Sequence, residues 1–271
     1  MTHANDELLD IARSTAIAAG ELIRAKRAEG VAVAALKSSP VDVVTEADRE
    51  SEELIRGLLA DARPADGFFG EESGIGDAST TGITWVVDPI DGTVNYLYDI
   101  PQYAVSIAAV EGGTDPAGWT ALAGVVVNPA LGEVYSATRG GGAFLAGRRL
   151  EVAPGKELAT ALVATGFSYT AERRERQASA LTRLIPRIRD IRRQGSAALD
   201  LCAVATGRVD AYYERGLHPW DHAAGALIAA EAGARVAGLG GAPASEDFTL
   251  AAEPGLFAQL EPLLEEFGAA L

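Results

Sequence analysis

The most informative stretch of the sequence reads Trp85-Val86-Val87-Asp88-Pro89-Ile90-Asp91-Gly92-Thr93-Val94-Asn95-Tyr96. An apolar strand delivers two aspartates, Asp88 and Asp91, across a Pro-Ile turn, and Gly92 and Thr93 then open a helix. Carboxylates at a strand end, beside the amides of a helix start, suit hard cations together with phosphate. The alternative is a tight Asp-Pro turn followed by a helix cap, which these residue types form in many loops. The spacing alone leaves both interpretations open.

Length and composition limit the class of protein. Of the 271 residues, 48% are hydrophobic, which is enough for a core and excludes disorder as the main state. This length is typical of one large domain or two fused domains. The N-terminus lacks the basic start and apolar run of a signal peptide, and no stretch approaches about 18 consecutive apolar residues. Cys202 is the single cysteine, so it cannot form an internal disulfide or a Cys-based zinc site. We therefore expect a cytoplasmic protein.

The chain is acidic, with 23 Lys and Arg against 38 Asp and Glu and a net charge of −15. Long-range repulsion by this charge argues against a general nucleic-acid binder or a protein of anionic membranes. The balance is reversed in residues 172–193, which hold eight arginines and three acidic residues. A solvated helix face explains this stretch most simply. It could also border a dimer interface or form a lip that attracts an anionic substrate.

The spacing of apolar residues predicts two halves of different character. The first half is expected to be rich in sheet, after an opening helix and a second helix that Thr45 and Asp48 cap. Its expected helix is 5–27, its extended segments are 41–45, 68–69 and 83–87, and its antiparallel strands are 103–110, 122–127 and 133–137. The second half alternates strands and helices, which is typical of an α/β arrangement. Its expected strands are 162–165, 188–192, 209–213 and one near 235, and its helices are 172–185, 196–206, 219–232 and 256–267.

Three further acidic segments flank these elements, and each has a structural explanation. Gly70-Glu71-Glu72-Ser73-Gly74 could be a solvated turn after a strand. Asp221 could stabilise the first turn of the helix that follows His218, and the segment 43–48 could be a helix cap. His218 and His222 lie beside Asp221 but do not predict zinc, because no third ligand cluster or His-Glu-x-x-His pattern accompanies them.

Taken together, these segments resemble the inositol monophosphatase family, part of a superfamily of lithium-sensitive, magnesium-dependent phosphatases that includes the fructose-1,6-bisphosphatases. Residues 88–96 match the family motif Asp-Pro-x-Asp-Gly-Thr-x-Asn-Phe, with Tyr96 in place of Phe. The second motif is met by Trp220, Asp221, Ala224, Gly225 and Glu231-Ala232-Gly233. Segments 37–48, 70–73 and 195–202 also look like family segments in the right order, so the resemblance spans about residues 8–235.

The resemblance implies an α/β (α+β) fold, a layered α-β-α-β-α sandwich. Residues 1–146 would form a sheet-rich half that carries most metal ligands, and residues 147–271 would form an α/β half that carries Glu214 and Asp221. The implied activity is Mg²⁺-dependent hydrolysis of inositol monophosphate by metal-activated water, with two or three ions per site. The family resemblance also implies a homodimer.

The resemblance assigns roles residue by residue. The implied metal ligands are Glu71, Asp88, the carbonyl of Ile90, Asp91 and Asp221, an all-oxygen set of the kind that Mg²⁺ prefers. The implied catalytic residues are Asp48, Glu71 and Thr93, with the threonine hydroxyl bonded to Asp48 and holding the attacking water together with Glu71. The implied substrate-binding residues are Asp91, Gly92, Thr93, Gly195, Ser196, Ala197, Glu214 and Asp221.

The expected substrate is a small phosphorylated polyol. The carboxylates of Asp48, Glu71, Asp88, Asp91 and Asp221 would repel a phosphate monoester unless divalent ions bind first. Glu214 could accept hydrogen bonds from vicinal hydroxyls. Histidinol phosphate, fructose 1,6-bisphosphate and nucleotide 3′-phosphates are alternative substrates, because only the pocket rim would differ. A protein-binding regulator with residual phosphatase activity is the alternative from another class.

Overall fold

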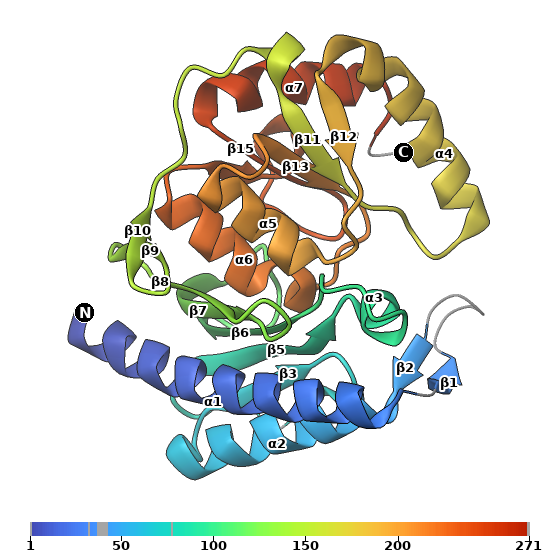
Figure 1. Ribbon diagram of the computed structural model, residues 1–271. Coiled ribbons are helices and arrows are strands. Elements are labelled where there is room, and N and C mark those ends of the chain that lie inside the picture. The colour runs from blue at the N-terminus through green and yellow to red at the C-terminus, as the bar shows by residue number, and fades with distance from the viewer. Residues whose placement is uncertain (1, 32, 37–42, 77, 270–271) are drawn as a thin grey trace.

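The computed structural model describes residues 2–31, 33–36, 43–76 and 78–269, and its elements stack in five layers (Figure 1). From the bottom of the view upward, they are a pair of helices, an eight-stranded sheet, a second pair of helices, a five-stranded sheet and an outer pair of helices. The predicted α-β-α-β-α sandwich is therefore confirmed.

The first layer consists of α1 (Thr2–Glu29) and α2 (Glu46–Ala62). In α1, apolar residues recur every three or four positions and are buried against the first sheet: Leu8, Ala12, Ala16, Ala19 and Ile23. The helix starts three residues earlier than the predicted Asn5 and stops at Gly30, whose φ of +106° suits glycine. Thr45 and Asp48 cap α2 as predicted, with the Thr45 amide donating to the Asp48 carboxylate at 2.7 Å.

The eight-stranded sheet has the order β10-β9-β8-β7-β6-β5-β3-β4. Its strands are β3 (Gly67–Gly70), β4 (Gly74–Ile75), β5 (Ile83–Asp91), β6 (Ala104–Glu111), β7 (Thr120–Asn128), β8 (Glu133–Thr138), β9 (Gly142–Leu145) and β10 (Arg148–Leu150). All its neighbouring strands are antiparallel except β3 and β5. Every residue of β5 is buried, because helices cover both faces of the sheet.

The prediction that the strand carrying Asp88 ends at Val87 is wrong, because β5 runs on to Asp91. Asp88 still pairs with Ser106 of β6, and pairing resumes at Asp91 with Ala104 after a shift in register. Pro89 lies in the irregular part, where a missing N–H is tolerated. Both aspartates are thus anchored to a central strand rather than carried by a loop.

The second sheet has the order β12-β11-β13-β15-β14 and separates two helix layers. Its strands are β11 (Leu162–Thr165), β12 (Asp190–Arg192), β13 (Ala211–Glu214), β14 (Arg235–Ala237) and β15 (Thr249–Ala252). The middle helices are α5 (Ala197–Thr206) and α6 (Pro219–Glu231), and the outer ones are α4 (Ala171–Leu184) and α7 (Pro254–Glu266). Side chains alternate between faces: Val163 packs on the outer side and Ala164 on the side of α5.

Several short elements were not predicted. They are β1 (Val33–Leu36), strands β4, β9, β10 and β15, and the 3-10 helices Leu158–Thr160, Ile185–Arg187 and Leu239–Gly241. β1 pairs with β2 (Val43–Thr45), which lies in the predicted extended segment 41–45. Residues 37–42 of the family-like segment 37–48 lie outside the described residues. The division at residues 146 and 147 remains a proposal, and β10, just beyond it, still pairs with β9. Within the described residues, no helix is long and apolar enough to cross a membrane.

Candidate active site

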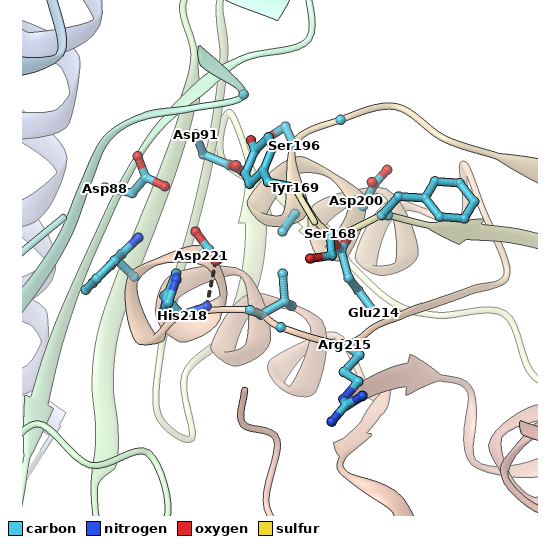
Figure 2. Close-up of a pocket in the computed structure, with 18 of the residues that line it drawn as sticks. Asp88, Asp91, Ser168, Tyr169, Ser196, Asp200, Glu214, Arg215, His218 and Asp221 are labelled. Atoms are coloured by element: carbon cyan, nitrogen blue, oxygen red, sulfur yellow. Dashed lines mark hydrogen bonds between the residues drawn. The ribbon is translucent and has the colours of Figure 1, made fainter. Parts of the chain in front are cut away.

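A pocket of about 590 Å³ lies where the end of β5 meets the starts of α5 and α6 (Figure 2). It is lined by all but one of the residues that the sequence predicted for the site: Glu71, Asp88, Ile90, Asp91, Gly92, Thr93, Gly195, Ser196, Ala197, Glu214 and Asp221. The remaining one, Asp48, lies behind this lining and contacts Thr93. The fold therefore brings residues from both halves of the chain to one place.

Three carboxylates converge at one end of the pocket. Oxygen atoms of Asp88, Asp91 and Asp221 lie within 4.8 Å of one another, and Figure 2 shows the three side chains around a common space. The Ile90 amide donates to Asp88 at 3.0 Å, which orients the first carboxylate. Asp221 is in the first turn of α6 and accepts the His218 amide at 2.7 Å, so the helix start orients it.

Burial makes the negative charge of this cluster unfavourable. Desolvation, then repulsion from Glu71, Asp91 and Asp221, raises the pKa of Asp88 well above its ordinary value. Desolvation followed by repulsion from Asp91 and Glu71 also raises the pKa of Asp221. Burial raises the pKa of Asp91 to about 6. A buried, convergent, all-oxygen donor set whose members repel one another suits a hard divalent cation, so these residues fit the metal that the family resemblance implies.

Glu71 reaches the cluster from the turn that follows β3. Its amide donates to the carbonyl of Val87 at 3.1 Å, which ties the turn to β5. Its carboxyl lies close enough to Asp88 to hydrogen-bond to it and to raise the pKa of Asp88. The interpretation of this segment as a merely solvated turn is therefore wrong for Glu71, which lines the pocket.

Asp48 and Thr93 form the hydrogen-bonded pair that the resemblance implied. The Thr93 hydroxyl lies 3.0 Å from Asp48 Oδ1 and 3.0 Å from the Ile90 carbonyl. Asp48 is completely buried, and its second oxygen accepts the Thr45 amide and hydroxyl. Burial raises the pKa of Asp48 to about 6, although the bonds from Thr45 and Thr93 oppose this rise. The capping device of α2 is therefore also what fixes Asp48 against Thr93.

Residues of the second half of the chain hydrogen-bond to Asp91. Ser196 Oγ donates to Asp91 Oδ2 at 2.5 Å, and the Ala198 amide donates to the same oxygen at 2.7 Å. Ser196 also caps α5 by accepting the Leu199 amide at 3.3 Å. Gly92 is needed here, because its φ is +90° and a Cβ would lie 3.1 Å from the Gly195 carbonyl. Close main-chain contact thus joins the two halves beside the carboxylates.

Glu214 ends β13 and faces the pocket rather than open solvent. Tyr212 OH donates to Glu214 Oε2 at 2.7 Å. Burial raises the pKa of Glu214 to about 7, while the bond from Tyr212 and the charge of Arg193 lower it. Tyr212 and Tyr213 are buried, as predicted for core residues, but Tyr212 also orients Glu214.

Part of the pocket was not predicted from sequence. These lining residues are Gly166, Phe167, Ser168, Tyr169, Thr170, Arg173, Arg193, Asp200, Arg215, Gly216, Leu217, His218, Trp220 and Glu246. Figure 2 shows Arg215 at the end of the pocket away from Asp88. The arginine-rich stretch 172–193 was the one signal for this region: Arg173 and Arg193 line the pocket, whereas Arg176 and Arg192 form exposed ion pairs with Glu172 and Asp190. Asp200 lies within α5 and Trp220 in the first turn of α6, whereas residues 166–170 and 215–217 follow strands β11 and β13 of the second sheet.

Comparison with known proteins agrees with this geometry. The sequence matches the inositol monophosphatase family over residues 4–270. It is 46% identical to the inositol-1-monophosphatase SuhB of Mycobacterium tuberculosis over 98% of this chain and 97% of that protein. It is 39% identical to the Nus factor SuhB of Pseudomonas aeruginosa over 86% of each. The solved structure of extragenic suppressor protein suhB from Bartonella henselae gives a TM-score of 0.87 at 34% identity, covering 96% of this chain and 98% of that one. As the motifs predicted, the chain belongs to the inositol monophosphatase family.

Proposed function

We propose that this protein is a Mg²⁺-dependent phosphomonoesterase that hydrolyses inositol monophosphate to inositol and phosphate. Family membership and the names of relatives support a phosphatase. The observation that carries the proposal is the convergence of Asp88, Asp91 and Asp221 in one buried cluster, with Glu71 and the Thr93–Asp48 pair beside it. We also propose, from the family resemblance, a cytoplasmic homodimer.

The metal ligands in this proposal are Glu71, Asp88, the carbonyl of Ile90, Asp91 and Asp221, and they would hold two or three Mg²⁺ ions. When bound, the ions would offset the carboxylate charge, make a water molecule more acidic and stabilise the charge that develops on the phosphate. Because clustered carboxylates repel an anionic substrate when they are ionised, metal binding would precede substrate binding.

Thr93 and Glu71 would orient the attacking water. The Thr93 hydroxyl can donate its proton to Asp48, which leaves its oxygen free to accept a proton of the water. Glu71 would accept the other proton as the general base. The amides of Gly92 and Thr93, at the start of α3 (Thr93–Leu97), would bind the phosphate.

The polyol would occupy the part of the pocket formed by the second half of the chain. Gly195, Ser196 and Ala197 would contact it through the start of α5, and the Glu214 carboxylate would accept hydrogen bonds from vicinal hydroxyls. Tyr212 supports this role, because it binds one Glu214 oxygen and leaves the other for a ligand. The arginines at the rim would attract the anionic substrate.

The test is a comparison of kcat/KM on inositol, histidinol, fructose and adenosine phosphates, with wild type and Asp91→Asn side by side. Inositol monophosphate should give the highest value, and the variant should lose most of its activity while remaining folded. Full activity in Asp91→Asn would contradict the proposed metal-dependent phosphatase function. A higher value for another substrate would replace inositol monophosphate and leave the phosphatase proposal standing.

A second candidate function, a protein-binding regulator, is favoured by one finding: a relative is named a Nus factor. The clustered carboxylates count against regulation as the main role. A pull-down that finds a stoichiometric macromolecular partner, together with negligible phosphatase turnover, would support the regulator instead.

A further inference from the structure

The buried face of α2 carries polar residues in its N-terminal part, which lies next to the site. Asp48 is followed on this face by Ser51 and Glu52, and then by Ile55 and Leu59. All five are buried and lie at positions i, i+3, i+4, i+7 and i+11, as expected for one helix face. The apolar residues of this stripe pack in the core, so the polar ones need another explanation.

Glu52 is bound to the main chain of the turn that carries Glu71. Its Oε2 accepts the Glu72 amide at 2.8 Å, and its Oε1 accepts the Ser73 amide at 2.9 Å. The carboxylate also fills the space beside Gly70, where a Cβ would lie only 2.4 Å from Oε2. Gly70 is therefore required for the close approach of the turn to α2.

This arrangement is energetically demanding. Glu52 is only 4% exposed, and burying a carboxylate is costly unless strong hydrogen bonds compensate. Both of its oxygens bind consecutive amides of a single turn, which restrains the position of that turn at two points. A turn needed only to connect β3 and β4 would not require a buried charge beneath it.

Other residues of the same helix face hold neighbouring parts of the site. Ser51 Oγ donates to the Pro89 carbonyl at 3.3 Å, between the aspartates of β5. Asp48 accepts from Thr93 at 3.0 Å. One rigid helix thus contacts three segments that must keep fixed relative positions: the turn of Glu71, the Asp88–Asp91 segment and the start of α3.

We propose that Glu52 is a positioning residue of the phosphatase site: by holding the amides of Glu72 and Ser73, it fixes the Glu71 carboxylate beside Asp88. The inference rests on the proposed function, because it gives Glu71 a role as metal ligand and base. Glu52 itself contacts neither the pocket nor its carboxylates, and it acts through the turn. Partners that orient metal ligands typically change metal affinity or activity about 10- to 100-fold when they are replaced.

The test compares Glu52→Gln with Glu53→Gln, an exposed neighbour on the same helix. Glutamine keeps the size of Glu52 but sets an NH₂ group against one of the two amide donors. Calorimetric titration with Mn²⁺ alone should show affinity weaker by about 10-fold or more in Glu52→Gln. Its kcat should fall by a similar factor while KM changes less than about twofold, and Glu53→Gln should match wild type in all three.

Wild-type Mn²⁺ affinity and kcat in a folded Glu52→Gln variant would overturn the proposal, and so would a change confined to KM. Should Glu52→Gln fail to fold in a thermal-unfolding control, Glu52→Asp decides: it keeps the charge but shortens the reach, so unaltered Mn²⁺ binding there would also overturn the proposal. The Mn²⁺ comparison is independent of activity. A wild-type protein that lacks phosphatase turnover would refute the proposed function while leaving the role of Glu52 testable.

Discussion

Replacing Asp91 with Asn should stabilise the metal-free protein and destabilise it relative to wild type when Mg²⁺ is present. Burial raises the pKa of Asp91 from 3.8 to about 6, so the folded state binds this proton more tightly than the unfolded state. The carboxyl therefore contributes its full stability below about pH 4 and loses it as the pH rises through about 6. At pH 8 the charged form opposes folding by up to about 3 kcal/mol, the equivalent of a shift of about two pKa units.

The increase in the free energy of unfolding that follows removal of this charge should be smaller than about 3 kcal/mol. Ser196 and Ala198 donate to the carboxylate at 2.5 and 2.7 Å, and they would bind a neutral amide oxygen less strongly. We expect a net gain of about 1–2 kcal/mol in the free energy of unfolding, which for a chain of this size is on the order of 2–8 °C in Tm.

The assay is thermal unfolding at pH 8, in excess chelator and then in excess Mg²⁺. In chelator the variant should melt above wild type. Mg²⁺ should raise the Tm of wild type by binding the folded state and should leave the variant nearly unchanged, so that the order reverses. Asp61→Asn, an exposed change on α2, should follow wild type in both conditions. If Asp91→Asn melts below wild type in chelator, or if Mg²⁺ raises its Tm as much as that of wild type, burial of the Asp91 charge does not oppose folding or Asp91 does not bind the ion.

Three further predictions concern single side chains. Thr93→Val removes the hydroxyl that bonds to Asp48 and should lower kcat by about 100-fold or more, whereas Thr93→Ser should keep most of the wild-type kcat. A normal kcat for Thr93→Val in steady-state kinetics would contradict the catalytic role of Thr93. Glu214→Gln should raise KM for inositol monophosphate about 10-fold without affecting p-nitrophenyl phosphate. Because the pKa of Glu214 is about 7, the KM of wild type should rise as the pH falls below 7, and the KM of Glu214→Gln should not. If Glu214→Gln impairs the hydrolysis of both substrates equally, Glu214 does not recognise the polyol. Arg173→Gln should lower kcat/KM severalfold at low salt and little at high salt, while Arg176→Gln, which breaks only an exposed ion pair, should have no effect; a loss independent of salt would exclude steering.

The family motifs predicted which residues line the site, and short-range rules predicted how two of them are held. Thr45 and Asp48 form a local cap, and Asp221 takes its place from the start of α6. Long-range contacts explain the misses. The strand carrying Asp88 runs past Val87 because β6 supplies its partners.

Glu52 shows the same limit more clearly. It lies in the polar run Glu50-Ser51-Glu52-Glu53, whose composition alone favours exposure to solvent. Helical spacing places Glu52, but not Glu53, on the face of Asp48 and Ile55, and the packing of the Gly70–Ser73 turn against α2 supplies the partners of its carboxylate. Residues 166–170, which line the pocket, were not predicted for a similar reason: they lie beside it only once the second sheet has formed.

In the proposed mechanism, the carboxylates of Asp88, Asp91 and Asp221 act through bound divalent cations. The most direct test follows the release of phosphate from inositol 1-phosphate by protein that has been dialysed against chelator and then titrated with Mg²⁺. We expect no measurable turnover in chelator and full recovery as Mg²⁺ saturates the site. Turnover that persists after the metal has been removed would contradict it.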